Sequence, residues 1–161
     1  MSEEIFALLD QLSIDYERVD HVPVYTSEQA RRLVPQQNAA SAKNLFLKDK
    51  KGKNHFLLVF DDQKKIDFEH LAEQIDSSRL SLASPRRLKT HLGIDPGAVS
   101  LLALMNDREN EVGLLFDREL WDEEYLQCHP LVNTATLVIS MADVKRFLDA
   151  VKHQPILVDI A

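Results

Sequence analysis

The chain has 161 residues, a length that predicts one domain, and 45% of them are apolar, enough for a core without disulfide or metal support. One cysteine excludes an internal disulfide and suits a reducing cytoplasm, and the net charge of −7 argues against broad nucleic-acid binding. We expect no signal peptide and no membrane span, because the chain starts without a basic leader or a long apolar run.

The first part of the chain predicts two helices with a short strand between them. The first helix is amphipathic, with these apolar residues at helical spacing: Ile5, Leu8, Leu9 and Leu12. A strand is expected at about 16–20. Thr26 and Gln29 have the spacing of a capping box, which predicts a helix that ends before Pro35.

The middle of the chain predicts a hairpin followed by two helices. Residues 43–49 and 54–61 form the two strands of the hairpin, joined by a lysine-rich turn. Asp67 caps the first helix. Ser84, followed by a proline, starts the second helix, which ends near Gly93.

The last part of the chain alternates strands and helices. The expected elements are strands at 99–105 and 111–116, a short helix with Trp121, strands near 125–128 and 136–140, a helix with Val144, Phe147, Leu148 and Val151, and a strand at 156–160. Adjacent strands joined by short turns favour antiparallel pairing, with helices packed on the sheet.

The segment Lys43-Asn44-Leu45-Phe46-Leu47-Lys48-Asp49 has polar ends around an apolar centre. Strand alternation puts Lys43 on the same face as Leu45 and Leu47, which we expect to be buried. A buried ammonium is costly unless a polar or anionic group meets it, so Lys43 is a candidate ligand-binding residue. The alternative is that Lys43 lies at the strand end and extends to water.

No metal or nucleophile motif is present in the sequence. The six histidines lack metal-ligand spacing. Cys128 and His129 are neighbours that would face opposite sides of a strand, so we expect Cys128 to be a core residue rather than part of a dyad. The chain has no Gly-x-Ser-x-Gly, Walker or dinucleotide-binding motif, and we expect neither a metal nor a cofactor.

The segment 93–100 predicts a rigid turn. Pro96 fixes one backbone angle, and Gly97 lets the backbone approach a ligand closely. Free N–H groups in this turn could stabilise an oxyanion. The alternative is an ordinary connection between a helix and a strand.

The segment 43–49 resembles the signature strand of the YbaK/prolyl-tRNA-synthetase-associated family, whose members hydrolyse wrongly charged tRNA. Three further segments fit the family in the same order: Gly93–Ser100, Gly113–Asp117 and His129–Leu137. The resemblance is to the stand-alone branch that removes alanine from tRNA(Pro). Leu101 departs from similar proteins, which often carry proline there, and this bears on the loop shape and on the amino acid preferred.

The resemblance implies an α/β (α+β) fold with a mixed, mostly antiparallel, curled sheet flanked by helices, in one editing domain over 1–161. Lys43 would anchor the 3′-terminal adenosine, and Asn44 would bind the ribose or the amino acid. His129 would shape the pocket, and the Gly97 amide would face the oxyanion. The remaining substrate-binding positions would be Phe46, Pro96, Ser100, Asn133 and Thr134, and the helix at 26–34 would cover the site.

Two basic segments stand out in this acidic chain. Their predicted tRNA-binding residues are Lys50, Lys51, Lys53, Arg86 and Arg87. An acidic protein with local basic segments can bind one end of a tRNA without binding nucleic acid at large. The alternative is that both segments are solvated surface.

The sequence therefore predicts a cytoplasmic trans-editing deacylase that hydrolyses alanyl-tRNA(Pro) at the acceptor end, with prolyl-tRNA synthetase or an elongation factor as further partners and no membrane association. Two alternatives stay open. One is a deacylase for cysteine or serine on tRNA. The other is a non-catalytic module that binds aminoacyl-tRNA or a synthetase.

Overall fold

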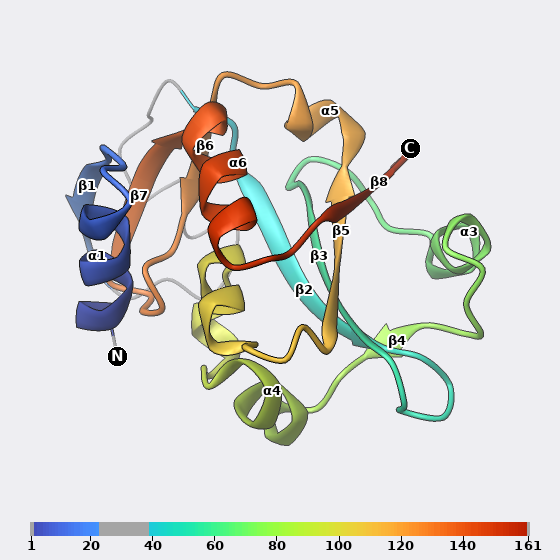
Figure 1. Cartoon of the computed structure of the whole chain (residues 1–161). Helices are drawn as coiled ribbons and strands as arrows, with labels where there is room; N and C mark the ends of the chain where they lie inside the picture. The colour runs from blue at the N-terminus through green and yellow to red at the C-terminus, as the bar shows by residue number, and fades with distance from the viewer. Residues whose placement is uncertain (1, 23–38, 161) are drawn as a thin grey trace.

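The computed structural model describes residues 2–22 and 39–160. Two sheets form its framework (Figure 1). The small sheet has the order β1-β7-β6, and its bounds are Glu17–Asp20 for β1, Tyr125–Cys128 for β6 and Ala135–Ser140 for β7. Both of its strand pairs are antiparallel.

The large sheet has the order β4-β2-β3-β5-β8. Its strands are β2 (Ala42–Lys48), β3 (His55–Asp61), β4 (Ser81–Leu82), β5 (Val112–Asp117) and β8 (Pro155–Val158). Strand β2 is antiparallel to β3 and β4, whereas β5 is parallel to β3 and β8. The predicted fold, mixed and mostly antiparallel with flanking helices, is confirmed.

Within residues 2–22 and 39–160, one parallel bridge joins the two sheets, between Ala40 and Leu126. The Ala40 N–H donates to the Tyr125 carbonyl at 2.9 Å, and the Gln127 N–H donates to the Ala40 carbonyl at 3.0 Å. The start of β2 therefore lies beside β6, and we refer to this place as the sheet junction.

Four of the five α-helices in the described residues begin after a side chain that caps their first turn. The five are α1 (Ser2–Gln11), α3 (Phe68–Gln74), α4 (Pro85–Leu92), α5 (Arg118–Trp121) and α6 (Met141–Ala150). Asp67 and Ser84 cap α3 and α4 as predicted, and Gly93 ends α4 in the left-handed conformation with φ 69°. The helix predicted from Thr26 lies outside the described residues.

The strand predicted at 99–105 is wrong. Leu101–Asn106 is the 3₁₀ helix η2, and Pro96–Ala98 is the shorter η1. Four consecutive side chains, 101–104, are buried, so the segment has no polar alternation that could distinguish a strand from a helix. It also lacks β-branched residues, and the Ser100 hydroxyl accepts a bond from the Leu102 N–H at 3.2 Å to start the helix.

Apolar clusters cover both faces of the large sheet. Phe46 belongs to the larger cluster, with α1, α4, η2 and α6, and Leu47 belongs to the smaller one, against α3 (Figure 1). Because both faces are buried, β3 and β5 read as nearly continuous apolar runs. No helix in the described parts of the chain is long and apolar enough to cross a membrane.

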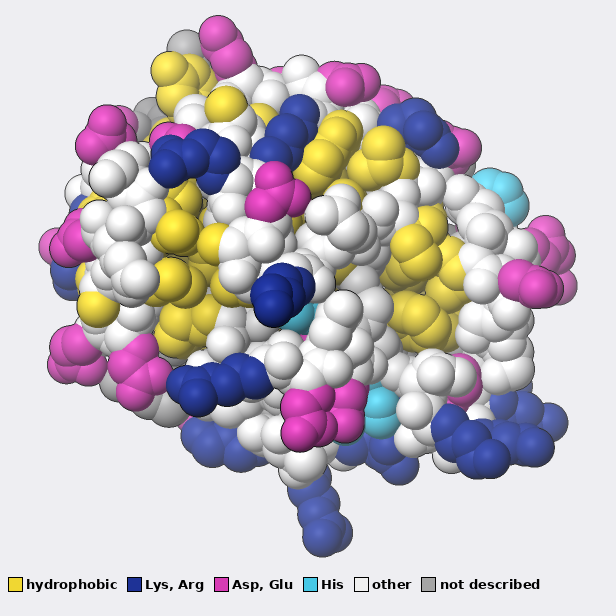
Figure 2. Space-filling model, in the orientation of Figure 1, with side chains coloured by type: hydrophobic (Ala, Val, Ile, Leu, Met, Phe, Trp, Pro, Cys, Tyr) yellow, Lys and Arg dark blue, Asp and Glu magenta, His cyan; other side chains and the backbone are white. Residues whose placement is uncertain are grey.

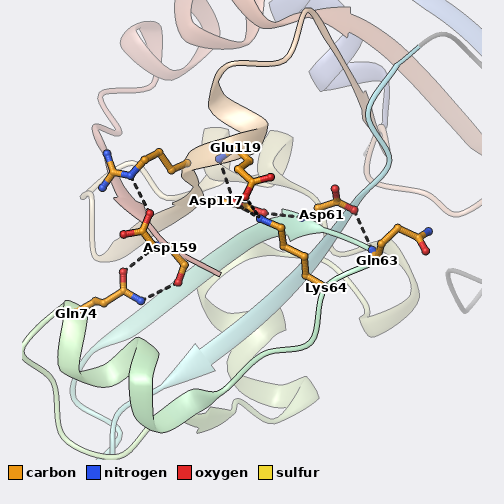
Figure 3. A network of polar contacts seen from close by, with 8 residues as sticks. Asp61, Gln63, Lys64, Gln74, Asp117, Glu119 and Asp159 are labelled. Atoms are coloured by element: carbon orange, nitrogen blue, oxygen red, sulfur yellow. Dashed lines mark hydrogen bonds and ion pairs between the residues drawn. The ribbon is translucent and has the colours of Figure 1, made fainter. Parts of the chain in front are cut away.

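A polar network closes the ends of β3 and β5 (Figure 3). Asp117 is fully buried, and its Oδ1 accepts bonds from the Lys64 ammonium and the Glu119 N–H, both at 3.1 Å. Its Oδ2 accepts a bond from the Asp61 N–H at 3.1 Å. One carboxylate thus ties β3, the turn that follows it and the start of α5 together, next to the first residues of β2.

Candidate active site

Asn44 carries an unsatisfied acceptor at the start of β2. Its Oδ1 is buried, and among the described residues it has no hydrogen-bond partner. Buried polar atoms are rarely left unpaired, because each such atom costs roughly 1–3 kcal/mol. An unpaired acceptor at the sheet junction indicates a site that awaits a donor from a ligand.

Lys43 points to the other face of β2, toward the side of Leu45 and Leu47, as strand alternation predicts. Of the two interpretations of Lys43, the structure agrees with the one in which the side chain extends to water, since Lys43 is exposed. The lysine stands near the start of the strand, where its long stem extends to water. The buried polar group of the signature strand is therefore Asn44, and Lys43 offers an accessible positive charge.

His129 directly follows β6, the strand of the small sheet that lies beside the start of β2. In the parallel register of the junction, His129 lies three residues beyond Leu126, as Lys43 lies three residues beyond Ala40. The His129 Nδ1 lies 3.5 Å from the Ala135 carbonyl, which can only accept; the tautomer with its proton on Nδ1 can donate to this carbonyl and leaves Nε2 as an acceptor.

His21, which sequence reasoning did not single out, lies near His129. Its Nε2 lies 2.9 Å from the Thr136 hydroxyl and its Nδ1 2.8 Å from the Val22 carbonyl. Burial lowers the pKa of His129 below its usual range; the hydrogen bond to the Ala135 carbonyl opposes this effect in part, and the neighbouring His21 adds a smaller decrease. No local motif marks His21, because only the pairing of β1 with β7 brings it to a residue 115 positions away.

From the lowered pKa values of His129 and His55 we predict that the protein loses stability in mild acid. Burial also lowers the pKa of His55, helped by His91 and Arg87. A histidine whose folded pKa lies below the unfolded value of about 6.5 binds more protons in the unfolded chain between those two values. We therefore expect the free energy of unfolding to fall as the pH drops below about 6.5, and to be insensitive to these two groups above it.

Urea unfolding at pH 7.5 and 5.5 measures this effect. The decrease should be smaller in His129→Gln and in His55→Gln than in the wild type, whereas His70→Gln, which changes an exposed histidine on α3, should leave it unchanged. Equal decreases in all four proteins would contradict the prediction.

The other predicted substrate-binding residues are dispersed. Phe46 is buried and packs against the rings of His55 and His91, with centroids 5.5 and 6.0 Å away. Ser100 is buried and caps η2, so packing accounts for both residues. Leu101, the position that departs from similar proteins, is buried in the larger cluster.

The remaining predicted residues lie in loops. Pro96 and Gly97 are in η1, between α4 and η2, and the oxyanion role of the Gly97 amide stays a prediction. Asn133 and Thr134 lie between β6 and β7, where the Thr134 carbonyl accepts a bond from the His21 N–H at 2.9 Å. This contact places the β6–β7 loop next to the histidines.

Cys128 lies in the core and is not placed as a nucleophile. Cys128 is buried, and burial raises the pKa of its thiol to about 12, so it is a protonated core residue as predicted. In residues 2–22 and 39–160, no three His, Cys, Asp or Glu side chains are grouped so that they could hold a metal ion.

The model of the aminoacyl-tRNA editing domain matches residues 21–147. The chain belongs to this family. The matched region of the editing domain starts at His21 and includes Asn44, His129 and the sheet junction.

Relatives of this editing protein match most of its length. It is 38% identical to the prolyl-tRNA editing protein ProX of Acetoanaerobium sticklandii over 148 residues, 92% of this chain and 90% of that one. It is 33% identical to the prolyl-tRNA synthetase associated domain-containing protein 1 of Danio rerio over 159 residues, 98% and 86% of the two chains.

The fold of the editing domain is also found in solved structures. One, proposed to be a trans-editing enzyme for prolyl-tRNA synthetase, superposes with a TM-score of 0.70 at 15% identity, covering 99% of this chain and 95% of the other. At that identity the match supports the fold.

Proposed function

We propose that this protein is a trans-editing deacylase that hydrolyses the ester between alanine and tRNA(Pro). Family membership supports an aminoacyl-tRNA substrate, and the names of the relatives support tRNA(Pro). The observation that carries the catalytic reading is the buried, unpaired Oδ1 of Asn44, because a site preformed to accept a hydrogen bond needs a donor from its substrate.

The reaction needs little activation, because an aminoacyl ester is already reactive. A water oxygen attacks the ester carbonyl, the bond to the ribose oxygen breaks, and that oxygen takes up a proton to leave free tRNA and alanine. No strong nucleophile is required, which fits a core cysteine that stays protonated.

Asn44, His129 and Lys43 have different roles in this proposal. Asn44 Oδ1 accepts a bond from the alanine ammonium or a ribose hydroxyl, both of which are donors. His129 stays neutral at pH 7, since its pKa is lowered, and its Nε2 orients the water or the ribose hydroxyl. Lys43 provides an exposed charge for the terminal phosphate or the carbonyl oxygen. The acceptor end of tRNA(Pro), further contact with prolyl-tRNA synthetase or an elongation factor, and a cytoplasmic location belong to this proposal.

The relative rates of hydrolysis of alanyl-tRNA(Pro) and prolyl-tRNA(Pro) test the proposed substrate. A proline editor must spare prolyl-tRNA(Pro), and proline is larger than alanine, so a tight pocket can reject it by steric clash. We expect alanyl-tRNA(Pro) to be hydrolysed at least about 10²-fold faster than prolyl-tRNA(Pro), measured as the rate of release of labelled amino acid.

A panel with cysteinyl- and seryl-tRNA serves as the comparison. Preferential hydrolysis of either would reject alanine while retaining the deacylase class. No hydrolysis of any aminoacyl-tRNA, with binding preserved, would favour the non-catalytic module.

A further inference from the structure

The two basic segments of the chain form one surface. Arg87 on α4 donates from Nη1 to the Gly52 carbonyl at 3.0 Å, and the same nitrogen lies 2.9 Å from His55 Nε2. A third segment joins them, because the Lys50 N–H donates to the Ser78 hydroxyl at 3.2 Å. We refer to residues 50–53, 78–79 and 84–89 as the basic surface.

The turn of the basic surface is rigid. The Asp49 carboxylate is buried and accepts bonds from the Lys53 N–H at 2.9 Å and from the Asn54 side chain at 2.8 Å. Gly52 has φ 69°, and a Cβ there would lie 2.7 Å from the Arg87 guanidinium. The single acidic side chain of the turn therefore points inward, and the lysines project from a fixed backbone.

Positive charge accumulates here although the chain carries −7 overall. The exposed cations are Lys50, Lys51, Lys53, Arg79, Arg86 and Lys89. Figure 2 shows Lys and Arg side chains gathered along the lower edge of the molecule, over the β2–β3 turn and α4. The only exposed cation of this set with an ion pair among the described residues is Lys89, at 3.6 Å from Asp95. The others are available to an anionic partner.

Arg87 differs from these cations. Its guanidinium is half-buried and bonded to the turn, so it holds α4 against β2–β3 instead of facing solvent. Sequence reasoning grouped Arg87 with Arg86 as a tRNA contact. In the structure, only Arg86 is exposed.

The basic surface lies at the far end of β2 from the candidate active site (Figure 1). Lys43 and Lys48, near the two ends of β2, are about 17 Å apart, since a strand rises about 3.3 Å per residue, and Lys50 lies beyond Lys48 in the turn. A partner that contacts both Lys43 and Lys50 must carry negative charge well beyond the ester. The phosphate backbone of an RNA duplex next to the aminoacyl end has this property, and a short ester lacks it.

We infer that the basic surface binds the phosphate backbone of the acceptor stem of the substrate tRNA, and that Arg87 assembles this surface without contacting the RNA. The inference rests on the proposed function for its substrate, and its own evidence is the arrangement of charge.

The test compares two alanyl esters, one on an RNA minihelix that contains the acceptor stem and one on the trinucleotide CCA. The measured quantity is the ratio of kcat/KM for the minihelix to kcat/KM for the trinucleotide. Lys50→Glu/Lys51→Glu/Lys53→Glu should lower this ratio at least about 10-fold and flatten its dependence on salt, because fewer phosphates are neutralised. The matched control is Lys65→Glu/Arg108→Glu/Lys152→Glu, three exposed cations elsewhere, which should leave the ratio unchanged.

Arg87 is tested by charge-preserving substitution. Arg87→Lys should lower the ratio as much as Arg87→Gln does, because lysine is one atom shorter and lacks the guanidinium that bridges Gly52 and His55. Arg86→Lys should retain the wild-type ratio. Rescue by Arg87→Lys would make Arg87 a direct phosphate contact and overturn its assembling role.

The outcomes separate this inference from the proposed function. If the kcat/KM ratio is unchanged in the triple variant, or falls equally in its control, the inference that the basic surface binds the acceptor stem is overturned. If the wild type hydrolyses neither ester, the deacylase proposal fails. The surface is then tested by binding of uncharged minihelix, which must weaken in the triple variant and not in its control.

Discussion

Replacing Asn44 with leucine is expected to abolish most activity while leaving the protein as stable as before, or more stable. The buried Oδ1 has no partner in the described part of the chain, so an apolar side chain of similar shape removes an unsatisfied acceptor. We expect kcat/KM on alanyl-tRNA(Pro) to fall about 10²-fold, the scale for loss of one oriented contact in a transition state, and the free energy of unfolding to stay equal or rise by about 1 kcal/mol. Deacylation kinetics and urea unfolding measure the two quantities.

Asn54 provides the contrasting asparagine. Its side chain donates to Asp49, so Asn54→Ala should lower the free energy of unfolding by about 1 kcal/mol. We expect this variant to lose stability rather than kcat/KM. Lys43→Ala, a change at an exposed position, should keep its stability and lose about 10²-fold in kcat/KM. A large loss of stability with normal activity in Asn44→Leu would make Asn44 a structural residue and remove the main support for the site.

Replacing Lys64 with methionine is expected to cause a large loss of stability. Lys64 has a side-chain exposure of 14% and is the cation that faces the fully buried Asp117 (Figure 3). Removal of one partner leaves an uncompensated buried charge, which costs about 3–5 kcal/mol. Chemical unfolding of Lys64→Met gives the free energy directly.

Arg118→Met is the matched control in the same network. Arg118 pairs with Asp159 at 3.0 Å, but the two side chains are 54% and 69% exposed, so loss of the pair should cost less than about 1 kcal/mol. A cost for Lys64→Met no larger than that for Arg118→Met would show that Asp117 is stabilised by its N–H donors alone.

Local signals predicted most of the fold. Asp67, Ser84 and Gly93 end or begin helices through bonds to their own neighbours, so short sequence patterns suffice to place them. The 3₁₀ helix η2 was not predicted, because its consecutive buried residues show neither the helical nor the strand periodicity of apolar and polar residues. Its conformation depends on the surrounding core.

The site could be predicted only in part. The resemblance selected β2 and the His129 segment, but alternation of side chains could not say that Lys43 is exposed and that the Asn44 oxygen is buried without a partner. His21 required the register of β1 on β7, and Arg87 required the contact of α4 with the turn. These are long-range contacts, which no local pattern encodes.

The sheet junction also sets when the protein can become active as it is synthesised. Gln127 donates to the Ala39 carbonyl 88 residues away, and β1 pairs with β7, so neither half of the site has its partner until the later strands exist. The pairing of β2 with β3 joins residues that are close in sequence and can form early, whereas the junction must close a long loop first. If the proposed site is correct, a nascent chain that has not yet released β7 from the ribosome carries Asn44 without a folded His129 segment, and we expect hydrolytic activity only when synthesis is nearly complete.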